Sequence, residues 1–346
     1  MARRTTAAAA GAALVALALV GCTAAGTTTE DDGAPTDVAV EAYVEPGAHA
    51  QDRVGSAAGR AAMIGVDGVT VADDGTALND APAGITDLAA TASGGGAAPE
   101  LLVSNYSETL GDFSPEVGTA LLASVANRER VARQLAALAA SEGMSGVQID
   151  LESLRGRDRA GLVAFAETLH EDVRVALGDD AEVSMAVMAS TTADGYRETG
   201  YDLAALADHV DRFVLMTYDQ HGPWSDPGTV GALPWAEHVV TAAEDEGLRA
   251  DRIDLGIAGY GYVWASRGAA ADAADPQLTP AAARRAAGSA AHWSARDSEW
   301  SASLDDGREL HWSDARSYRA RVSLAEDLGL HGVALWSLNS LALPSP

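Results

Sequence analysis

Lysine is absent from the 346-residue sequence, and all 23 basic residues are arginine. Schiff-base catalysis and a Walker-type phosphate loop both require a lysine, so the sequence excludes both. The single cysteine, Cys22, excludes an internal disulfide framework and a cysteine-rich metal site. Basic residues are also outnumbered by 50 acidic ones. The resulting net charge of −27 repels polyanions, which argues against nucleic acid as a partner.

Aromatic residues make up only 5% of the chain, but hydrophobic residues as a whole make up 47%. This content is too high for a disordered chain, and the length suffices for one large barrel-type domain or two smaller ones. The eight histidines include no H-E-x-x-H spacing, and neither a G-x-S-x-G motif nor a dinucleotide-binding fingerprint occurs. We therefore expect no metal and no cofactor.

The first 22 residues have the pattern of an export signal. Arg3 and Arg4 precede an apolar stretch, residues 7–20, which is too short to span a bilayer comfortably. The following L-V-G-C sequence resembles the bacterial lipobox, whose cysteine is acylated and becomes the mature N-terminus. An ordinary signal peptide with an incidental cysteine is the alternative.

These features predict a lipoprotein signal peptide over residues 1–22 with lipidation at Cys22. Residues 23–37, rich in Ala, Gly, Thr and acidic residues, are expected to form a flexible tether. The protein would be exported and anchored by its lipid on the outer face of the bacterial cell membrane. Residues 38–346 remain for the folded domain.

Eight short β-rich runs alternate with helical patterns over this domain. Several are nearly continuous apolar stretches, as expected for parallel strands buried on both faces. The runs span residues 38–44, 61–71, 101–105, 146–151, 182–188, 212–218, 253–260 and 332–338. This alternation predicts an α/β fold, a (β/α)8 TIM barrel, with an open doubly wound sheet as the alternative.

Helix boundaries are marked by caps and glycines. Ser114 followed by Pro115 predicts a helix start, with a helical region up to Glu142 and a break near Asn127. Further helices are expected around residues 162–177, from Asp202 through Leu203, Leu206 and Val210, over 234–246, and over 322–328. Residues 263–312 interrupt the alternation and predict an insertion between the seventh strand and the last helix, with a hairpin over 300–312.

Acidic residues end the fourth predicted strand, where barrel enzymes place their chemistry. Strand side chains alternate, so Gln148, Asp150 and Glu152 share one face and are expected to point into the barrel mouth. Crowded like charges raise the pKa of one carboxyl, which can then serve as a general acid near neutral pH. A strand end that merely meets a polar loop is the alternative interpretation.

Three motifs resemble those of glycoside hydrolase family 18. Residues 146–152 resemble the end of its strand-four signature, D-x-x-D-x-D-x-E, and residues 216–219 (MTYD) match its M-x-Y-D motif. Trp336 occupies the place of the tryptophan that forms the floor of the sugar subsite. The segments LMTYDQHGPW, GIAGYGYVW and HWSDAR make the chain most similar to the spore-germination, cortex-lytic branch. The first two signature aspartates fall at Ser145 and Gln148, which leaves the tuning of Asp150 open.

The resemblance implies retaining, substrate-assisted hydrolysis of β-1,4 bonds next to N-acetylglucosamine. Glu152 would be the acid, Asp150 would stabilise the acetamido N–H, and Tyr218 would hold the acetamido oxygen. Met216, Asp219 and Trp336 would line the sugar subsite together with Gln148, although Met216 could equally be core packing. Three further residues end strands and are candidate sugar contacts: Tyr43, Asn105 and Tyr260.

The expected partner is an N-acetylglucosamine-containing glycan, peptidoglycan or its fragments before chitin, bound by a monomer. A non-catalytic glycan-binding protein on the same fold is the alternative from another class. Such proteins usually lose the acidic glutamate, and Glu152 is present.

Overall fold

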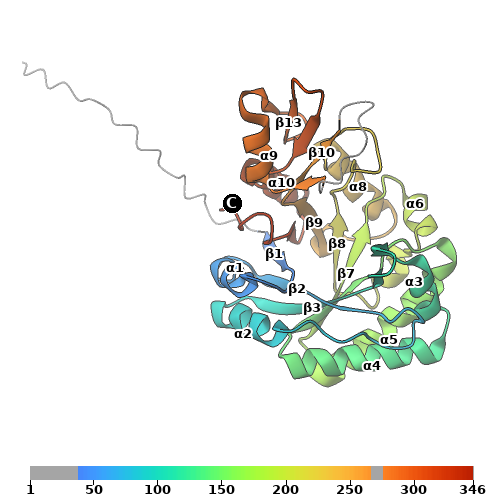
Figure 1. Cartoon of the computed structure of the whole chain (residues 1–346). Helices are drawn as coiled ribbons and strands as arrows, with labels where there is room; N and C mark the ends of the chain where they lie inside the picture. Colours follow the sequence, from blue (N-terminus) through green and yellow to red (C-terminus); the bar gives the residue numbers. More distant parts are fainter. Residues whose placement is uncertain (1–37, 266–275, 346) are drawn as a thin grey trace, which may run out of the picture. The chain divides into compact units, whose positions relative to one another are not determined.

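The computed structural model describes residues 38–265 and 276–345 (Figure 1). The predicted signal peptide, the tether and Cys22 lie outside the described residues, so those predictions stay untested. In the described part of the chain, no helix combines the length and the apolar character needed to cross a membrane.

Eight parallel strands close into a barrel, which confirms the predicted (β/α)8 fold and excludes the open sheet. Around the barrel the order is β1-β15-β9-β8-β7-β6-β3-β2. Their bounds are β1 Ala39–Val44, β2 Met63–Thr70, β3 Ala98–Ser104, β6 Gly146–Asp150, β7 Glu182–Met188, β8 Arg212–Met216, β9 Ile253–Ala258 and β15 Gly332–Trp336. Each apolar run of the sequence became a strand because its outward residues pack under helices and its inward residues fill the barrel.

Helices surround this barrel: α1 Ala50–Ala57, α2 Ile85–Gly95, α3 Pro115–Leu122, α4 Val125–Glu142, α5 Arg159–Leu177, α6 Ala193–Glu198, α7 Leu203–Leu206, α8 Leu233–Asp245 and α10 Ala315–Leu328. The expected break before Asn127 is present, because the Ser124 side chain caps a new helix by accepting from the Asn127 N–H. The helix predicted from Asp202 spans only four residues, and Val210 lies outside it. Short 3₁₀ turns span Gly156–Asp158, Ala250–Arg252 and Gly288–Ala290.

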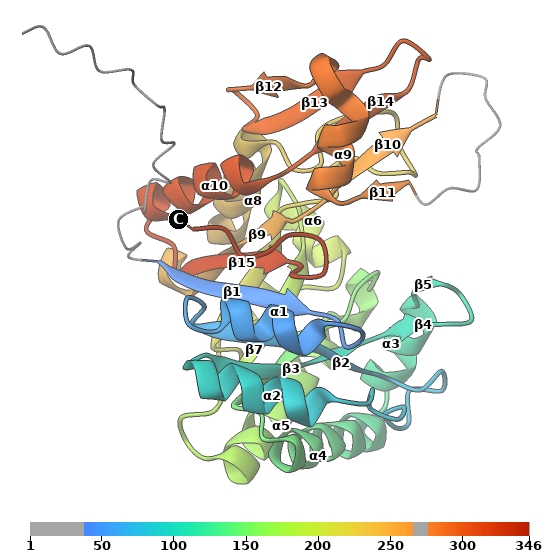
Figure 2. The same cartoon turned by 60° about the vertical axis from the view of Figure 1, so that its left-hand side comes forward.

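The insertion is larger than the predicted hairpin. It forms a five-stranded antiparallel sheet in the order β11-β10-β14-β13-β12, and α9 (Pro280–Ala287) packs against it (Figure 2). The strands are β10 Gly261–Trp264, β11 Gln277–Leu278, β12 His292–Ser294, β13 Glu299–Ser303 and β14 Glu309–Trp312, of which β13 and β14 form the predicted hairpin. A separate ribbon, β4 Tyr106–Ser107 with β5 Asp112–Phe113, follows β3.

A buried ion pair fastens the insertion to the barrel. Glu299 accepts hydrogen bonds from the backbone N–H groups of Val230 at 2.9 Å and Gly231 at 2.7 Å, and it pairs with Arg321 of α10 at 3.1 Å. Because Val230 and Gly231 close the loop that follows β8, Glu299 fixes that loop where it borders the barrel mouth.

Candidate active site

Four predicted site residues meet at the carboxyl ends of β6 and β8. Asp150 ends β6, Glu152 follows two residues later, and Tyr218 and Asp219 follow β8. The charges of Asp150, Glu152 and Asp219 all act on the buried Tyr218 hydroxyl and raise its pKa, after burial itself. The four side chains therefore share one site.

The two acids of β6 favour their protonated forms. Burial, followed by the negative charges of Asp150 and Asp219, raises the pKa of Glu152 well above the usual glutamate range. Burial and the charge of Asp67 raise the pKa of Asp150 to about 7. A carboxyl that keeps its proton near neutral pH can donate it to a leaving group, as a general acid must.

Asn105, directly after β3, holds the backbone of Glu152. Its Nδ2 donates to the Glu152 carbonyl at 2.8 Å, and its Oδ1 accepts from the Glu152 N–H at 2.8 Å. Nδ2 also donates to the Ser114 carbonyl at 2.9 Å, and the side chain is fully buried. The structure thus places Asn105 behind the acid, and its predicted contact with sugar stays untested.

Asp219 is held by two tyrosines. The hydroxyls of Tyr260 and Tyr262 donate to its Oδ1 at 2.7 and 2.9 Å. Its backbone is left-handed, with φ +58°, which turns the chain sharply after β8. Burial raises the pKa of Asp219, and the two hydroxyl donors oppose that shift.

Room for Tyr218 is made by a glycine on the neighbouring strand. A Cβ added at Gly256 of β9 would lie 2.9 Å from the ring atom Cε1 of Tyr218 and 2.5 Å from the Leu215 carbonyl.

Met216 is buried at the end of β8. Its position is compatible with both interpretations of the sequence, core packing and the wall of a subsite.

Trp336 stands across the barrel mouth from Glu152. It ends β15, which lies four strands from β6 in the eight-stranded ring. Its ring lies 5.3 Å from that of Tyr43, and Trp336 packs, as Tyr218 does, against the cluster that contains Tyr260, Tyr262 and Trp264. A cavity of about 260 Å³ adjoins Trp336 and Tyr260, and Glu45, Gln277, Leu278, Thr279, Ser337 and Ser340 complete its lining.

Gln148 lies one layer deeper than predicted for a residue that binds substrate. It is fully buried, its Oε1 accepts the Tyr43 hydroxyl at 2.8 Å, and its Nε2 donates to Ser184 Oγ at 2.8 Å and to Glu100 at 3.3 Å. The amide therefore links the barrel interior to Tyr43, which packs on Trp336. Direct contact of Gln148 or Tyr43 with sugar is not tested.

An ion cluster that the sequence analysis missed fills the barrel below this site. Arg212 is buried and donates to Glu41 at 2.6 Å, Asp254 at 2.7 Å and Glu100 at 2.8 Å. Burial is the main cause that raises the pKa of Glu100 to about 8. Charged residues inside otherwise apolar strands are the signal that could have revealed this cluster, because an unpaired buried charge is too costly to keep.

Asp67, Glu45 and Tyr262 were also missed. Asp67 lies in β2, where the V-D pair stands between two glycines in an apolar run, so the run reads as an ordinary buried strand. Burial, followed by the charge of Glu45, raises the pKa of Asp67 to about 6. Among the described residues, no group of three or more His, Cys, Asp and Glu side chains is placed to hold a metal ion.

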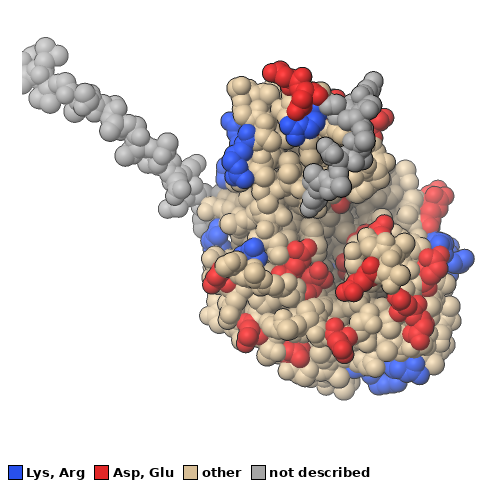
Figure 3. Space-filling model, in the orientation of Figure 1, with Lys and Arg blue, Asp and Glu red and all other residues tan. Residues whose placement is uncertain are grey.

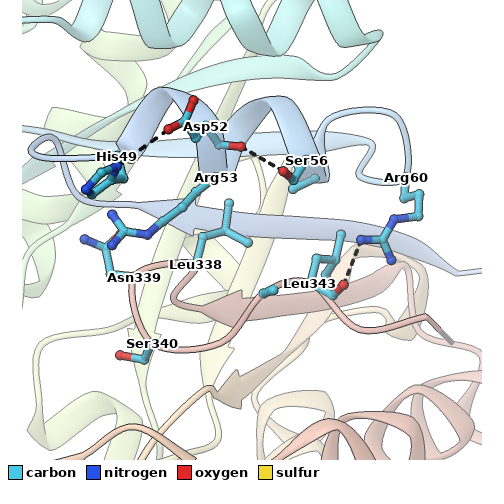
Figure 4. A pocket seen from close by; sticks show the side chains of 11 residues that line it. His49, Asp52, Arg53, Ser56, Arg60, Leu338, Asn339, Ser340 and Leu343 are labelled. Atoms are coloured by element: carbon cyan, nitrogen blue, oxygen red, sulfur yellow. Dashed lines mark hydrogen bonds and ion pairs between the residues drawn. The ribbon is translucent and has the colours of Figure 1, made fainter. Parts of the chain in front are cut away.

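A larger cavity, of about 370 Å³, shares Ser340 with the smaller one (Figure 4). It runs between α1 and the segment after β15, and it contains none of the predicted site residues. Arg53 and Arg60 at its edge already donate to the carbonyls of Ala48 and Leu343. The chemistry therefore belongs to the barrel mouth.

Acidic side chains are prominent on the face shown in Figure 3, and basic ones are few and apart. The excess of acidic over basic residues in the sequence is therefore visible on this face of the molecule.

The sequence model of Glycosyl hydrolases family 18 matches residues 91–340. The chain is 28% identical over 235 residues to the cortical fragment-lytic enzyme of Bacillus subtilis (strain 168), a match that covers 65% of this chain and 54% of that protein. The chain spans about half the length of the curated relatives it matches.

Two solved structures share the fold. The spore cortex-lytic enzyme SleL of Bacillus cereus superposes with a TM-score of 0.76 at 20% identity, over 89% of this chain and 72% of that one. A chitinase from Chromobacterium violaceum ATCC 12472 superposes with a TM-score of 0.75 at 23% identity, over 88% of this chain and 95% of that one. At such identities the likeness establishes the fold alone.

Proposed function

The chain belongs to glycosyl hydrolases family 18, and from this premise we propose that it hydrolyses β-1,4 bonds next to N-acetylglucosamine by a retaining, substrate-assisted mechanism. The observation that carries the proposal is the pair Asp150 and Glu152 at the end of β6. Their pKa values are raised, and both carboxyls lie near enough to Tyr218 for their charges to raise the pKa of its hydroxyl.

In this mechanism Glu152 gives its proton to the glycosidic oxygen as the bond to the anomeric carbon breaks. The substrate's own acetamido carbonyl oxygen attacks that carbon and forms an oxazolinium ion. Asp150 accepts a hydrogen bond from the acetamido N–H and stabilises the positive charge of the oxazolinium ion. Tyr218 holds the acetamido oxygen in line with the anomeric carbon that it attacks. Glu152, now a carboxylate, takes a proton from water, and the water opens the ring with net retention.

The cavity beside Trp336 supports a second sugar position. Trp336 would stack beneath the reacting sugar, with Glu152 at the leaving-group oxygen on the opposite side of the mouth. The cavity is lined by Trp336 and by no residue of β6 or of the segment that carries Glu152, so it would hold the preceding sugar, on the non-reducing side. Its hydroxyl, amide and carboxyl groups suit the hydroxyl-rich rim of a pyranose.

Peptidoglycan or its fragments are our proposed substrate, and chitin oligomers are the alternative. Similarity to the cortical fragment-lytic enzyme of Bacillus subtilis (strain 168) supports the first, and the shared fold of the Chromobacterium violaceum chitinase is compatible with the second. We also propose export and lipid anchoring through Cys22, supported by Arg3, Arg4 and the lipobox-like sequence. Loss of membrane association in Cys22→Ala would test the anchor.

A product analysis tests the substrate. Residues 23–346 are incubated with glycan strands freed of peptide and, separately, with chitin oligomers, and the products are identified by mass spectrometry. Reducing-end N-acetylglucosamine from glycan strands supports a peptidoglycan glucosaminidase, whereas cleavage of chitin alone changes the substrate and keeps the mechanism. Binding of either glycan without any product would move the protein to the non-catalytic class. The first-formed anomer, read by NMR, should be β, and an α product would contradict retention.

A further inference from the structure

The larger cavity, between α1 and the segment after β15, has no role in the mechanism above. Its volume of about 370 Å³ falls in the range of about 300–1,000 Å³ that small-molecule sites occupy. Ser340 lines both this cavity and the smaller one beside Trp336. A group attached to a sugar in the smaller cavity therefore has the larger cavity next to it.

Asn339 joins the walls of the two cavities. Its Oδ1 accepts the Glu45 N–H at 3.1 Å, and its Nδ2 donates to the Glu45 carbonyl at 3.4 Å. Glu45 lines the smaller cavity, and Asn339 lines the larger one. Arg53 of the larger cavity also acts on Glu45, because its charge opposes the rise in the Glu45 pKa that burial causes. The two cavities thus lie side by side along the segment after β15.

Two arginines line the larger cavity, and Arg53 is the one nearer to the barrel mouth. It donates through Nη1 to the Ala48 carbonyl at 2.9 Å, just before α1, whereas Arg60 follows α1 and donates to the Leu343 carbonyl at 2.8 Å. Helices of this fold run back from the carboxyl ends of the strands, so α1 begins on the side of the mouth. In Figure 4 the two arginines lie at opposite ends of the cavity, with Ser340 on the side of Arg53.

Both guanidinium groups keep donors for a ligand. A guanidinium carries five N–H donors in a planar fork that matches a carboxylate, and the bonds to carbonyls use one nitrogen of each arginine. Among the described residues, no carboxylate lies within ion-pair distance of Arg53 or Arg60. Asp52, which also lines the cavity, pairs with His49 at 3.6 Å instead. In a chain with 50 acidic and 23 basic residues, such arginines are available to an anionic ligand.

The rest of the lining suits a small group that is partly apolar. Leu338 and Leu343 are buried and line the cavity together with Ala57 and Ala342. A ligand that carries a methyl group and a carboxylate on neighbouring carbons would meet apolar side chains and a guanidinium at once.

We propose that Arg53 binds a carboxylate of the substrate, the one on the 3-O-lactyl ether of N-acetylmuramic acid. When the reacting sugar is N-acetylglucosamine, the alternating backbone of peptidoglycan puts N-acetylmuramic acid at the preceding position, in the smaller cavity. Its lactyl arm passes Ser340 into the larger cavity and places its carboxylate at Arg53. Chitin has a hydroxyl at that position, so Arg53 selects peptidoglycan strands over chitin. This inference rests on the proposed function, which supplies the positions of the two sugars.

The test compares two forms of short peptide-free glycan strands, one with the lactyl carboxylate free and one with it reduced to a primary alcohol. The full-length wild type should cleave the carboxylate form with a kcat/KM higher by about 10-fold or more, the scale of one hydrogen bond between charged groups. Arg53→Gln should lose this preference through a higher KM for the carboxylate form and keep the wild-type rate on the alcohol form.

Arg60→Gln is the matched control. Arg60 lines the same cavity and also donates to one carbonyl, but at the end away from the mouth, so its loss should leave the preference in place. Thermal melts verify that both variants are folded. The assignment is wrong if Arg53→Gln keeps the preference or loses rate equally on both forms. An equal loss of preference in Arg60→Gln would also contradict it.

Binding separates this inference from the proposed function. The affinity of the wild type and of Arg53→Gln for both forms of strand is measured by isothermal titration calorimetry, with Glu152→Gln as the background if the strands are cleaved. If the wild type cleaves no glycan, the proposed function fails, and tighter binding of the carboxylate form that Arg53→Gln abolishes still supports the carboxylate site. Equal binding of the two forms overturns the inference even when the wild type cleaves both.

Discussion

Replacing Asn105 by alanine should lower turnover far more than it weakens substrate binding. The Asn105 amide makes three hydrogen bonds to backbone, two to Glu152 and one to Ser114. Those bonds use its donor and acceptor groups and keep the segment that carries the acid in place. A residue with this role acts on the position of Glu152, whereas a residue that touches sugar acts on affinity.

The structure sets the magnitude of this effect. Alanine leaves the Glu152 N–H buried without an acceptor and removes the donor shared by the carbonyls of Glu152 and Ser114. The Ser114 carbonyl keeps the Gly118 N–H at 3.1 Å, so the N–H and the carbonyl of Glu152 are the two orphaned groups. At about 1–3 kcal/mol for each of them, the unfolding free energy should fall by about 2–6 kcal/mol, and Tm by about 3–10 °C. The freed segment shifts the acid, and a misplacement of about 1 Å can reduce the rate about 10²-fold. We expect kcat to fall about 10- to 100-fold, with KM changed by less than about threefold.

Steady-state kinetics on N-acetylglucosamine oligomers, together with thermal melts, check this prediction. Asn127→Ala is the matched control, because Asn127 Nδ2 donates to the Ala120 carbonyl at 3.0 Å between two outer helices. It should lose some stability and keep its kcat. A rise in KM with unchanged kcat in Asn105→Ala would refute the reasoning and make Asn105 the sugar contact that the sequence suggested.

Two further predictions concern stability. Arg212→Leu leaves three buried carboxyl groups without their cationic partner and should cost about 3–5 kcal/mol in chemical unfolding. Arg308→Leu, which breaks an exposed ion pair, should cost less than about 1 kcal/mol, and equal effects would contradict the buried cluster. Burial raises the pKa of Asp67 to about 6, of Asp150 to about 7 and of Glu100 to about 8, so the folded protein binds more protons than the unfolded chain above the usual carboxyl range. Their contribution to stability therefore falls as pH rises from about 5 to about 8, and Tm should fall with it; a flat or rising Tm would contradict these shifts.

The barrel could be predicted from the sequence because each buried parallel strand is a short apolar run. The same period of two placed Asp150 and Glu152 on one inward face, and the structure puts both at the barrel mouth. The insertion was harder to foresee. Strands such as His292–Ser294 are short and polar, and they are recognisable only once they pair with their neighbours.

The residues that the sequence analysis missed depend on contacts between distant parts of the chain. Arg212 meets Glu41 across 171 positions, so no local pattern predicts that contact. Asn105 was named from the sequence, but only as a sugar contact, because its hydrogen bonds to Glu152 span 47 positions. Asp67 lies in an apolar strand, and its effect on the pKa of Asp150 is what distinguishes it. Local periodicity therefore specified the fold and the acids of β6, but not the groups that tune them.

The most direct test of the central claim compares the hydrolysis of glycan strands freed of peptide, and of chitin oligomers, by the wild-type protein and by Glu152→Gln. The substitution keeps the shape of the side chain and removes its proton, so the account predicts turnover in the wild type and a loss of at least about 10²-fold in the variant, the lower bound for general acid catalysis, at an unchanged Tm. Equal rates in the two proteins would contradict the assignment of Glu152 as the acid, and with it the mechanism proposed for this site.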